Sequence, residues 1–290
     1  MESTSSSIEL DAPAKVNLAL HVVGKRDDGY HDLRMISVRV GLCDKVRIDL
    51  STESGVRVGC PGVVEGEQNL AHKAATVLLE RLDATVGVEI SIEKRIPVAA
   101  GLGGGSSDAA SVLKGLNRLL DGPLPLEELM ELGVRVGADV PFFLFEKAAL
   151  VEGKGELLRE IQGLPRLWMI LVSPGFEVST FSVYRDFDSM LTNVTQRFSI
   201  LDLDEICRAK LGFKEVAASL HNDLERVTLR RHPVLAQVKQ TLRDRGAHGS
   251  LMSGSGPTVF GLFPDKRSAL AAAELDWGRM GWTVFPVHSI

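Results

Sequence analysis

The first part of the chain alternates hydrophobic and polar residues over three stretches. In KVNLALHVV, residues 15–23, the apolar side chains of Val16, Leu18, Leu20 and Val22 share one face, and the polar side chains share the other. The stretches KVRIDL and VGVEISIEKRI alternate in the same way. Because side chains point to opposite faces along a strand, this period of two predicts three β-strands, each with two different faces.

A second pattern, with apolar residues three and four apart, predicts helices between and after these strands. One such stripe lies between KVRIDL and VGVEISIEKRI and consists of Leu70, Ala74, Val77, Leu78 and Leu82. Another follows a glycine-rich run and extends from Ala109 to Leu120, where Gly122 and Pro123 end it. A further helix is expected from about Pro125 to Gly137.

The pattern starts afresh around residues 163–166. LWMILV predicts a buried strand, followed by helices in DLDEICRAKL, LERVTLRR and PVLAQVKQTLRD. The strands SLM and TVFGLF, joined by SGSGP, come next, and a helix in KRSALAAAELDW and a strand in WTVFPV follow. This order is typical of an α+β sandwich. We therefore expect two domains, residues 1–164 and residues 165–290, in a protein of the α+β class.

Composition excludes several functional classes. With 44% hydrophobic and 24% charged residues over 290 positions, the chain can bury a substantial core. A net charge of -5 and a pI of about 5.9 argue against a nucleic-acid partner, although a local basic pocket for a small anion is compatible with them. Three widely spaced cysteines favour a reducing compartment, and the start MESTSSS lacks the basic and apolar segments of a signal peptide. No apolar run reaches the ~20 residues of a membrane span, so we expect a cytoplasmic protein without a membrane partner.

The run IPVAAGLGGGSSDAASVL carries the strongest chemical signal. Four glycines lie within Gly101–Gly105, between a predicted strand and a predicted helix. Glycine lets a ligand approach the backbone, and the first turn of a helix offers N–H groups and a positive dipole end to an anion. The alternative is a glycine-rich turn capped by Ser106 or Ser107. The run lacks the lysine of a Walker A motif, and its glycine spacing does not match the dinucleotide fingerprint.

Three motifs together resemble one family. PVAAGLGGGSSDAA is similar to the central motif of the GHMP kinases, the family of galactose, homoserine, mevalonate and phosphomevalonate kinases. APAKVNLAL and LMSGSGPTVFGLF resemble its N-terminal and C-terminal motifs, in the same order. The resemblance implies a two-domain fold, with an N-terminal α/β domain that contains a mixed sheet, a C-terminal α+β sandwich and an active site in the cleft between them. It also implies ATP-dependent phosphorylation of a small alcohol with Mg²⁺, by a monomer or homodimer.

The resemblance assigns the ATP site to the glycine loop and two residues outside it. Lys94 and Asn69 are the outside residues, and the alternatives for them are an exposed charge and a helix cap. The segment Ser253–Pro257 is expected to close over the phosphates, unless it is a plain hairpin loop. No dedicated set of protein metal ligands is visible. The loop residues are Pro97, Val98, Ala99, Ala100, Gly101, Leu102, Gly103, Gly104, Gly105, Ser106 and Ser107.

Two residues are expected to carry the chemistry. Phosphoryl transfer needs a group that takes the proton of the attacking hydroxyl, and the resemblance assigns this role to Asp139 in GADVPFF. It places Lys15 beside that carboxylate, where an ammonium would keep the base ionised. The alternatives are that Asp139 only caps a helix, with Pro141 in its first turn, and that Lys15 is a solvated surface lysine.

The pairing of PAKVNL with DGYH distinguishes this chain within the family. It resembles members whose alcohol substrate carries a cytidine diphosphate group, and GADVPFF and HNDLE resemble the same members. Tyr30 is expected to stack on the cytosine, His31 to stack and hydrogen bond, and Asn17 to orient the substrate. Thr180 and Tyr184 are expected to form the second wall of the pocket, with Phe181 as an alternative to Tyr184 as the stacking ring.

Two other functions remain open at this stage. A homoserine or mevalonate-type kinase would need no cytosine pocket, so DGYH argues against it. A catalytically silent nucleotide-binding sensor would not need both Lys15 and Asp139.

Overall fold

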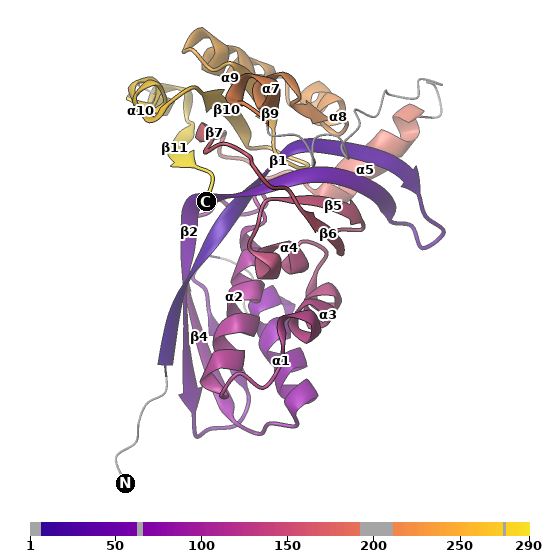
Figure 1. The fold of residues 1–290 in the computed structure, drawn as a ribbon, viewed down its shortest axis with the longest axis vertical. Helices are drawn as coiled ribbons and strands as arrows, with labels where there is room; N and C mark the ends of the chain where they lie inside the picture. Colours follow the sequence, from indigo (N-terminus) through magenta and orange to yellow (C-terminus); the bar gives the residue numbers. More distant parts are fainter. Residues whose placement is uncertain (1–6, 63–65, 192–210, 275–276) are drawn as a thin grey trace. The chain divides into compact units, whose positions relative to one another are not determined.

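The structure, a computed structural model, describes residues 7–62, 66–191, 211–274 and 277–290 (Figure 1). Its packing divides the chain into two compact units whose segments interleave. Unit 1 comprises Met1–Ala14, Leu42–Val98 and Gly103–Glu146, and unit 2 comprises Lys15–Gly41, Ala99–Leu102 and Lys147–Ile290, each as far as it is described. The long strands β1 (Ser7–Lys25) and β2 (His31–Ser51) contribute residues to both units.

Unit 1 combines a sheet with four helices. β2 pairs antiparallel with β4 (Gly87–Glu93), and the short β3 (Val56–Gly59) pairs parallel with β4 at the edge of the sheet. Both parallel and antiparallel pairs occur, so the sheet is mixed. The helices lie next to one another beside β4 and have these bounds: α1 Leu70–Leu82, α2 Gly104–Leu119, α3 Leu126–Val136 and α4 Val140–Phe145 (Figure 1). The predicted apolar stripes face inward, since Leu78, Leu113 and Leu116 are fully buried.

Unit 2 contains a four-stranded antiparallel sheet in the order β11-β7-β10-β9. α9 and α10 pack on it. The strands are β7 Trp168–Ser173, β9 Gly249–Met252, β10 Val259–Phe263 and β11 Thr283–His288. The helices among the described residues of the unit are α5 Thr180–Leu191, α7 Phe213–Ala218, α8 Glu225–Arg231, α9 Val234–Asp244 and α10 Lys266–Ala273. The sheet is apolar on both faces near its centre, because Met169, Ile170, Leu171 and Val172 are all fully buried.

The other strands of unit 2 extend from β1 and β2. β5 (Ala149–Gly153) pairs antiparallel with the start of β2 and with β6 (Leu157–Glu160). β8 (His221–Asn222) pairs parallel with β1, with Ala19 opposite His221. The part of the chain that the structure describes also contains short 3-10 turns at Gly66–Gln68 and Trp277–Met280.

The predicted elements are found where the structure describes them, with differences in their bounds and with several further elements. α2 begins at Gly104 rather than near Ser106, and β2 extends much further toward the N-terminus than KVRIDL. The elements that were not predicted are β3, α4, β5, β6, α5, α7 and β8. The predicted helix in DLDEICRAKL falls on residues 202–211, almost entirely outside the described residues. The division at residues 164 and 165 stays a prediction.

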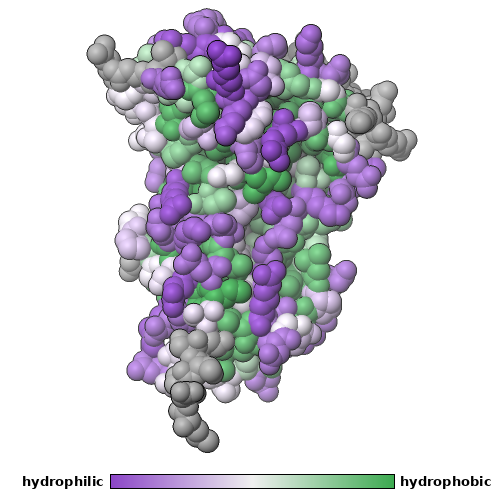
Figure 2. Space-filling view, turned by 60° about the vertical axis from the view of Figure 1, so that its left-hand side comes forward, coloured by the Kyte–Doolittle hydropathy of each residue, from purple (hydrophilic) through white to green (hydrophobic). Residues whose placement is uncertain are grey.

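The described surface is mixed in character. On the face drawn in Figure 2, hydrophilic residues are spread between hydrophobic ones. Among the described residues, no helix combines the length and the apolar character needed to cross a membrane.

Candidate functional site

The glycine loop leads directly into the first turn of α2. The residue that precedes the helix is Gly103, which adopts a left-handed φ of 72°, and no side chain caps the helix. Ser106 and Ser107 lie inside the first turns of α2, so the alternative of a serine-capped turn is wrong. Ser107 is 1% exposed, and its Oγ has no hydrogen-bond partner among the described residues. The N-terminus of α2 therefore combines uncapped backbone N–H groups with an unsatisfied buried hydroxyl, as an anion site requires.

Lys94 is held between two carboxylates in unit 1. Its Nζ donates to Asp44 Oδ2 at 2.5 Å and to Asp108 Oδ2 at 2.7 Å, and its side chain is 13% exposed. Asp44 is fully buried, and its Oδ1 accepts from the backbone N–H groups of Arg95 and Ile96. Lys94 is thus a partly buried, ion-paired lysine, and the alternative of an exposed charge is wrong.

Asp108 is the unsatisfied member of this group. It is 3% exposed, and its Oδ1 has no hydrogen-bond partner within the described residues. Burial raises the pKa of the Asp108 carboxyl, the charge of Lys94 opposes this shift and the charge of Asp44 adds to it, so that the pKa lies at about 7. Burial alone would lower the pKa of Lys94, but Asp108 and Asp44 outweigh it and raise that pKa. Within this cluster of Asp44, Lys94 and Asp108, Asp108 directly follows Ser107 on α2, and its Oδ1 is the oxygen without a hydrogen-bond partner among the described residues.

Two further candidates of unit 1 lie at helix starts. Asn69 precedes α1, and its side chain accepts from the Ala71 N–H at 2.9 Å, so it is a helix cap. Its contact with ATP stays a prediction. Asp139 is half-buried and precedes α4, but its side chain makes no cap hydrogen bond. The interpretation of Asp139 as only a helix cap therefore loses its physical basis.

Lys15 and Asn17 lie on β1 in unit 2. Lys15 is 6% exposed, and its Nζ donates to Asn17 Oδ1 at 2.5 Å, so the alternative of a solvated lysine is wrong. Asn17 is fully buried, and its Nδ2 donates to Ser37 Oγ at 2.9 Å. Residues of the hairpin and glycine loops lie against this part of β1, because the Lys15 N–H donates to the Leu102 carbonyl at 2.9 Å and the Asn17 N–H to Ser253 Oγ at 3.4 Å. Lys15 belongs to unit 2 and Asp139 to unit 1, and their joint role stays a prediction.

The loop Ser253–Pro257 joins β9 to β10 as a hairpin and packs on the glycine loop. Ser253 Oγ donates to the Gly101 carbonyl at 3.0 Å. A Cβ on Gly101 would lie 2.2 Å from the Ser253 carbonyl oxygen, and Gly101 has a φ of 75°, so this contact requires glycine. Asn222 fixes the hairpin from β8, because its Nδ2 donates to the carbonyls of Met252 and Gly254, both at 2.8 Å. A role of this loop over the phosphates stays a prediction.

The aromatic candidates gather at the start of β2 and on α5. The His31 and Tyr184 rings stack with centroids 4.9 Å apart, and His31 Nε2 lies 2.7 Å from Asp188 Oδ1. Tyr30 is 60% exposed, and Lys154 Nζ lies 4.8 Å from the centre of its ring. The side chain of Tyr30 is thus open to a ligand, while His31 is locked in place from two sides.

The second predicted wall is built by α5. Thr180 Oγ1 lies 2.9 Å from Ser255 Oγ, which connects the start of α5 to the hairpin loop. Phe181, the alternative to Tyr184, is 77% exposed. The stack between His31 and Tyr184 favours Tyr184 as the ring that completes the aromatic group.

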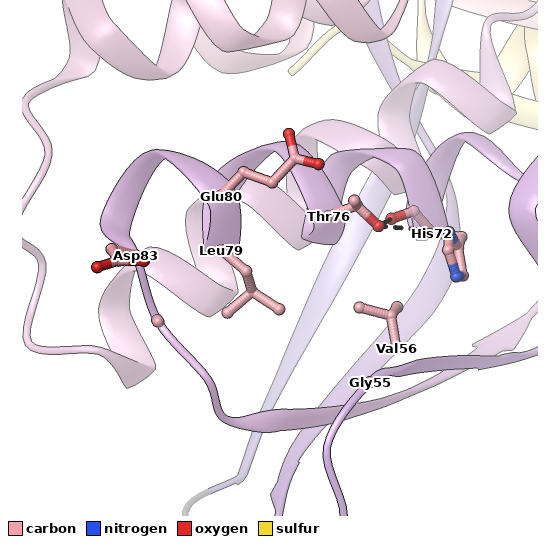
Figure 3. A pocket seen from close by; sticks show the side chains of 8 residues that line it. Gly55, Val56, His72, Thr76, Leu79, Glu80 and Asp83 are labelled. Atoms are coloured by element: carbon pink, nitrogen blue, oxygen red, sulfur yellow. Dashed lines mark hydrogen bonds between the residues drawn. The ribbon is translucent and has the colours of Figure 1, made fainter.

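The hollow drawn in Figure 3 lies elsewhere in unit 1. It measures about 300 Å³ and lies between the second half of α1 and the start of β3, where Leu79 points toward Val56. His72 and Thr76 line the same hollow, and the Thr76 hydroxyl donates to the His72 carbonyl oxygen at 3.0 Å. No candidate site residue lines this hollow, so it adds nothing to the site.

The family models match two parts of this sequence. The model described as "GHMP kinases N terminal domain" matches residues 69–147, and the model described as "GHMP kinases C terminal" matches residues 206–275. The first match contains the glycine loop, Lys94, Asp108 and Asp139. The chain belongs to the GHMP kinase family.

Relatives within the GHMP kinases extend the match to nearly the full length. A protein of Geobacter sp. (strain M21) named 4-diphosphocytidyl-2-C-methyl-D-erythritol kinase is 50% identical over 98% of this chain and 99% of its own. A protein of Syntrophus aciditrophicus (strain SB) with the same name is 44% identical with the same coverage.

Solved structures of GHMP kinases share the fold. A crystal structure of 4-(cytidine 5'-diphospho)-2C-methyl-D-erythritol kinase has a TM-score of 0.81 and 36% identity, covering 97% of this chain and 99% of that one. Homoserine kinase from Cytophaga hutchinsonii has a TM-score of 0.74 at 20% identity, covering all of this chain and 96% of that one. The latter comparison supports the fold alone.

Sequence reasoning missed several residues that organise the site. Asp108 directly follows the serines of the glycine run, so its position in GGSSDAA was a usable signal. Asp188 lies one helical turn after Tyr184, a spacing that places both on one face of α5. Asp44 comes from β2, 50 residues before Lys94, and no local pattern connects the two.

Proposed function

We propose that the chain is an ATP-dependent kinase that phosphorylates the 2-hydroxyl of 4-diphosphocytidyl-2-C-methyl-D-erythritol. The products are the 2-phosphate and ADP, and the reaction is a step of the non-mevalonate route to isoprenoid precursors. The observation that carries this proposal is the identity of about 50% over nearly the whole chain with relatives of that name. The exposed Tyr30 next to a locked His31 supports it, because a cytosine needs such a stacking surface.

ATP is the co-substrate of GHMP kinases, and we place its phosphates at the N-terminus of α2. The uncapped first turn supplies N–H donors, and the glycines allow the triphosphate to lie against the backbone. Lys94 would supply positive charge from below the loop, in keeping with its raised pKa. Asn69 would lie near the adenine.

The residues around Ser107 fit a magnesium ion. Mg²⁺ prefers oxygen ligands and is usually bound by one or two carboxylates together with the phosphates of the nucleotide. Ser107 Oγ and Asp108 Oδ1 are both buried oxygens that lack a hydrogen-bond partner among the described residues. These two atoms would hold the ion, which when bound neutralises charge on the phosphate oxygens.

The transfer step needs a base and a fixed alcohol. The oxygen of the 2-hydroxyl attacks the γ-phosphorus, the bond from that phosphorus to the β–γ bridging oxygen breaks, and the hydroxyl proton passes to Asp139. Lys15 would stabilise the ionised carboxylate and the developing alkoxide. Asn17, which holds the Lys15 ammonium at 2.5 Å, would position the substrate, while Tyr30, His31, Thr180 and Tyr184 would bind its cytidine part. A cytoplasmic location is part of the same proposal.

A substrate panel tests the proposal. ADP release is measured with ATP and Mg²⁺ in the presence of the cytidyl alcohol, mevalonate, homoserine or galactose. We expect kcat/KM for the cytidyl alcohol to exceed the other values at least 100-fold. Higher turnover of mevalonate or homoserine would make the chain a kinase of another small alcohol, and ATP binding without turnover of any alcohol would make it a silent nucleotide sensor.

A further inference from the structure

A histidine pair lies on β1 and β8 of unit 2, apart from every residue given a role above. His21 is on β1 and His221 is on β8, and the two rings stack with centroids 4.5 Å apart and planes 11° apart. Asp223 follows β8, and its Oδ1 lies 2.7 Å from His221 Nε2. β1 pairs parallel with β8, and Ala19 lies opposite His221. Because the Ala19 side chain is small, the ring of His21, two residues further along β1, has room beside the ring of His221.

The possible ligand atoms of the three side chains lie close together. One nitrogen or oxygen atom from each lies within 4.8 Å of the others. Tetrahedral coordination at bond lengths of about 2.0–2.1 Å separates neighbouring ligand atoms by about 3.3 Å, so small side-chain rotations close the remaining gap. The imidazole rings of His21 and His221 cannot stay parallel while both bind one metal ion, because the ion lies near the plane of each ring that binds it. Binding would therefore tilt the rings apart.

In this group, the buried polar atom that lacks a hydrogen bond is a ring nitrogen of His21. This residue is 3% exposed, and its Nε2 has no hydrogen-bond partner among the described residues. A buried ring nitrogen without a partner loses the hydrogen bonds that water would give it, and a ligand that accepts its lone pair removes that cost. The carboxylate is already oriented, because Asp223 Oδ2 accepts from the Val22 N–H at 2.8 Å.

We propose that His21, His221 and Asp223 form a binding site for a divalent transition-metal ion of the Zn²⁺ class. Two imidazoles and one carboxylate are ligands that zinc, cobalt and nickel prefer, whereas Mg²⁺ and Ca²⁺ take oxygen ligands. The ion takes the place of the hydrogen between His221 and Asp223, and His221 then carries its proton on Nδ1. The site is chemically distinct from the magnesium position at Ser107 and Asp108.

The charges around the group are compatible with a cation. Asp223 supplies the negative charge. Burial, His221 and Arg34 lower the pKa of His21, and Asp223 opposes them. Arg34 is itself paired, with its Nε 2.9 Å from Glu152 Oε1. An ion at this position would join β1, which carries Lys15 and Asn17, to β8, which carries Asn222. Its expected effect is therefore on the stability of unit 2.

Cobalt titration of the untagged full chain tests the site. Co²⁺ is the probe, followed by its visible absorption, and Zn²⁺ is then added as a competitor. We expect one Co²⁺ to bind per chain with the absorption of a four-coordinate nitrogen and oxygen site, and Zn²⁺ to displace it. At 100 times its dissociation constant, Zn²⁺ should raise the Tm by about 5 °C.

Substitutions locate the ion. His21→Gln, His221→Gln and Asp223→Asn should each weaken Co²⁺ binding by about 100-fold or more, whereas the control His72→Gln, on α1, should bind as the unchanged chain does. Thermal unfolding in EDTA checks that each variant folds. If His21→Gln does not fold, His221→Gln decides, because its side chain is 35% exposed and tolerates replacement. Absence of Co²⁺ binding to the unchanged chain, or equal binding by a folded His221→Gln variant, would overturn the proposal.

Discussion

At the scale of single residues, the decisive question concerns Asp139. If its carboxylate is the base, Asp139→Asn removes basicity but keeps the shape, and we expect kcat to fall by at least ~10²-fold. Binding of both substrates should change little, because the loss is confined to the transition state. Steady-state kinetics with a calorimetric check of ATP binding measures both. An Asp139→Asn enzyme with unchanged kcat would leave Lys15 and positioning alone to explain catalysis.

Tyr30 is the residue on which recognition of cytidine depends. Its ring is largely exposed, so Tyr30→Ala removes a stacking surface without opening the core. Losing one base stack costs about 1–3 kcal/mol, so KM for the cytidyl alcohol should rise roughly 5- to 150-fold, with KM for ATP unchanged. Phe181→Ala is the matched control on α5 and should have little effect. The opposite pattern would identify Phe181 as the stacking ring.

The raised pKa of Asp108 predicts that the free energy of unfolding depends on pH. Its pKa is about 7 in the folded chain against an ordinary value of 3.8, so the folded state binds more protons between these values. The contribution of Asp108 to stability is therefore complete below pH ~4 and is lost as the pH rises toward 7, by at most about 1.4 kcal/mol per pH unit. Asp108→Asn should remove this slope. Urea unfolding from pH 4 to pH 8 measures it, and parallel profiles of the two proteins would refute the assignment.

At the scale of elements, the glycine loop and the hairpin loop Ser253–Pro257 pack against each other. Gly101→Ala places a Cβ against the Ser253 carbonyl in a left-handed backbone, and we expect a loss of about 1–3 kcal/mol in unfolding free energy. Gly105→Ala is the matched control, because its Cβ would meet no atom closer than 3.8 Å, from Leu70. Gly105→Ala should keep its Tm but bind ATP about tenfold more weakly, if the triphosphate lies on the first turn of α2. Calorimetry that finds unchanged ATP affinity would move the phosphates elsewhere.

The individual helices and strands show how far the sequence predicts the structure. Helices with a clear apolar stripe, such as α1 and α9, were predicted almost to the residue, because one buried face imposes the period. β2 was predicted only in part, because the segment after His31 is buried at consecutive positions such as Met35, Ile36, Ser37 and Val38 and so lacks clean alternation. α5 was missed because its polar residues, which hold His31 and Ser255, interrupt the stripe.

The candidate site was predictable where residues follow one another in a motif. The glycine loop, Lys15 and Asp139 come from such motifs, and the resemblance to the GHMP kinases supplied their roles. The ion pair of Lys94 with Asp44 and the group of His21 with His221 were not predictable, because their members come from separate elements that only the fold brings together. Burial was equally hidden: the polar face of β1 looks solvated in sequence, but Lys15 and Asn17 are buried and contact Leu102 and Ser253, which are distant in sequence.

At the scale of the whole molecule, the proposed reaction draws on residues of both units. Lys15, Tyr30 and the hairpin loop belong to unit 2, whereas α2, the Lys94 cluster and Asp139 belong to unit 1. The glycine loop Pro97–Ser107 contains residues of both units, because Ala99–Leu102 belong to unit 2 and the residues before and after them belong to unit 1. A kinase needs both sets, while a nucleotide-binding sensor needs only the residues around α2.

The central claim, transfer of phosphate from ATP to the cytidyl alcohol, is tested most directly by ³¹P NMR of the reaction mixture. The chain is incubated with ATP, Mg²⁺ and 4-diphosphocytidyl-2-C-methyl-D-erythritol. We predict a new phosphomonoester resonance on the 2-position of the alcohol, growing in equal amount with ADP. Formation of ADP and inorganic phosphate without a phosphomonoester, or an unchanged ATP spectrum, would contradict the account.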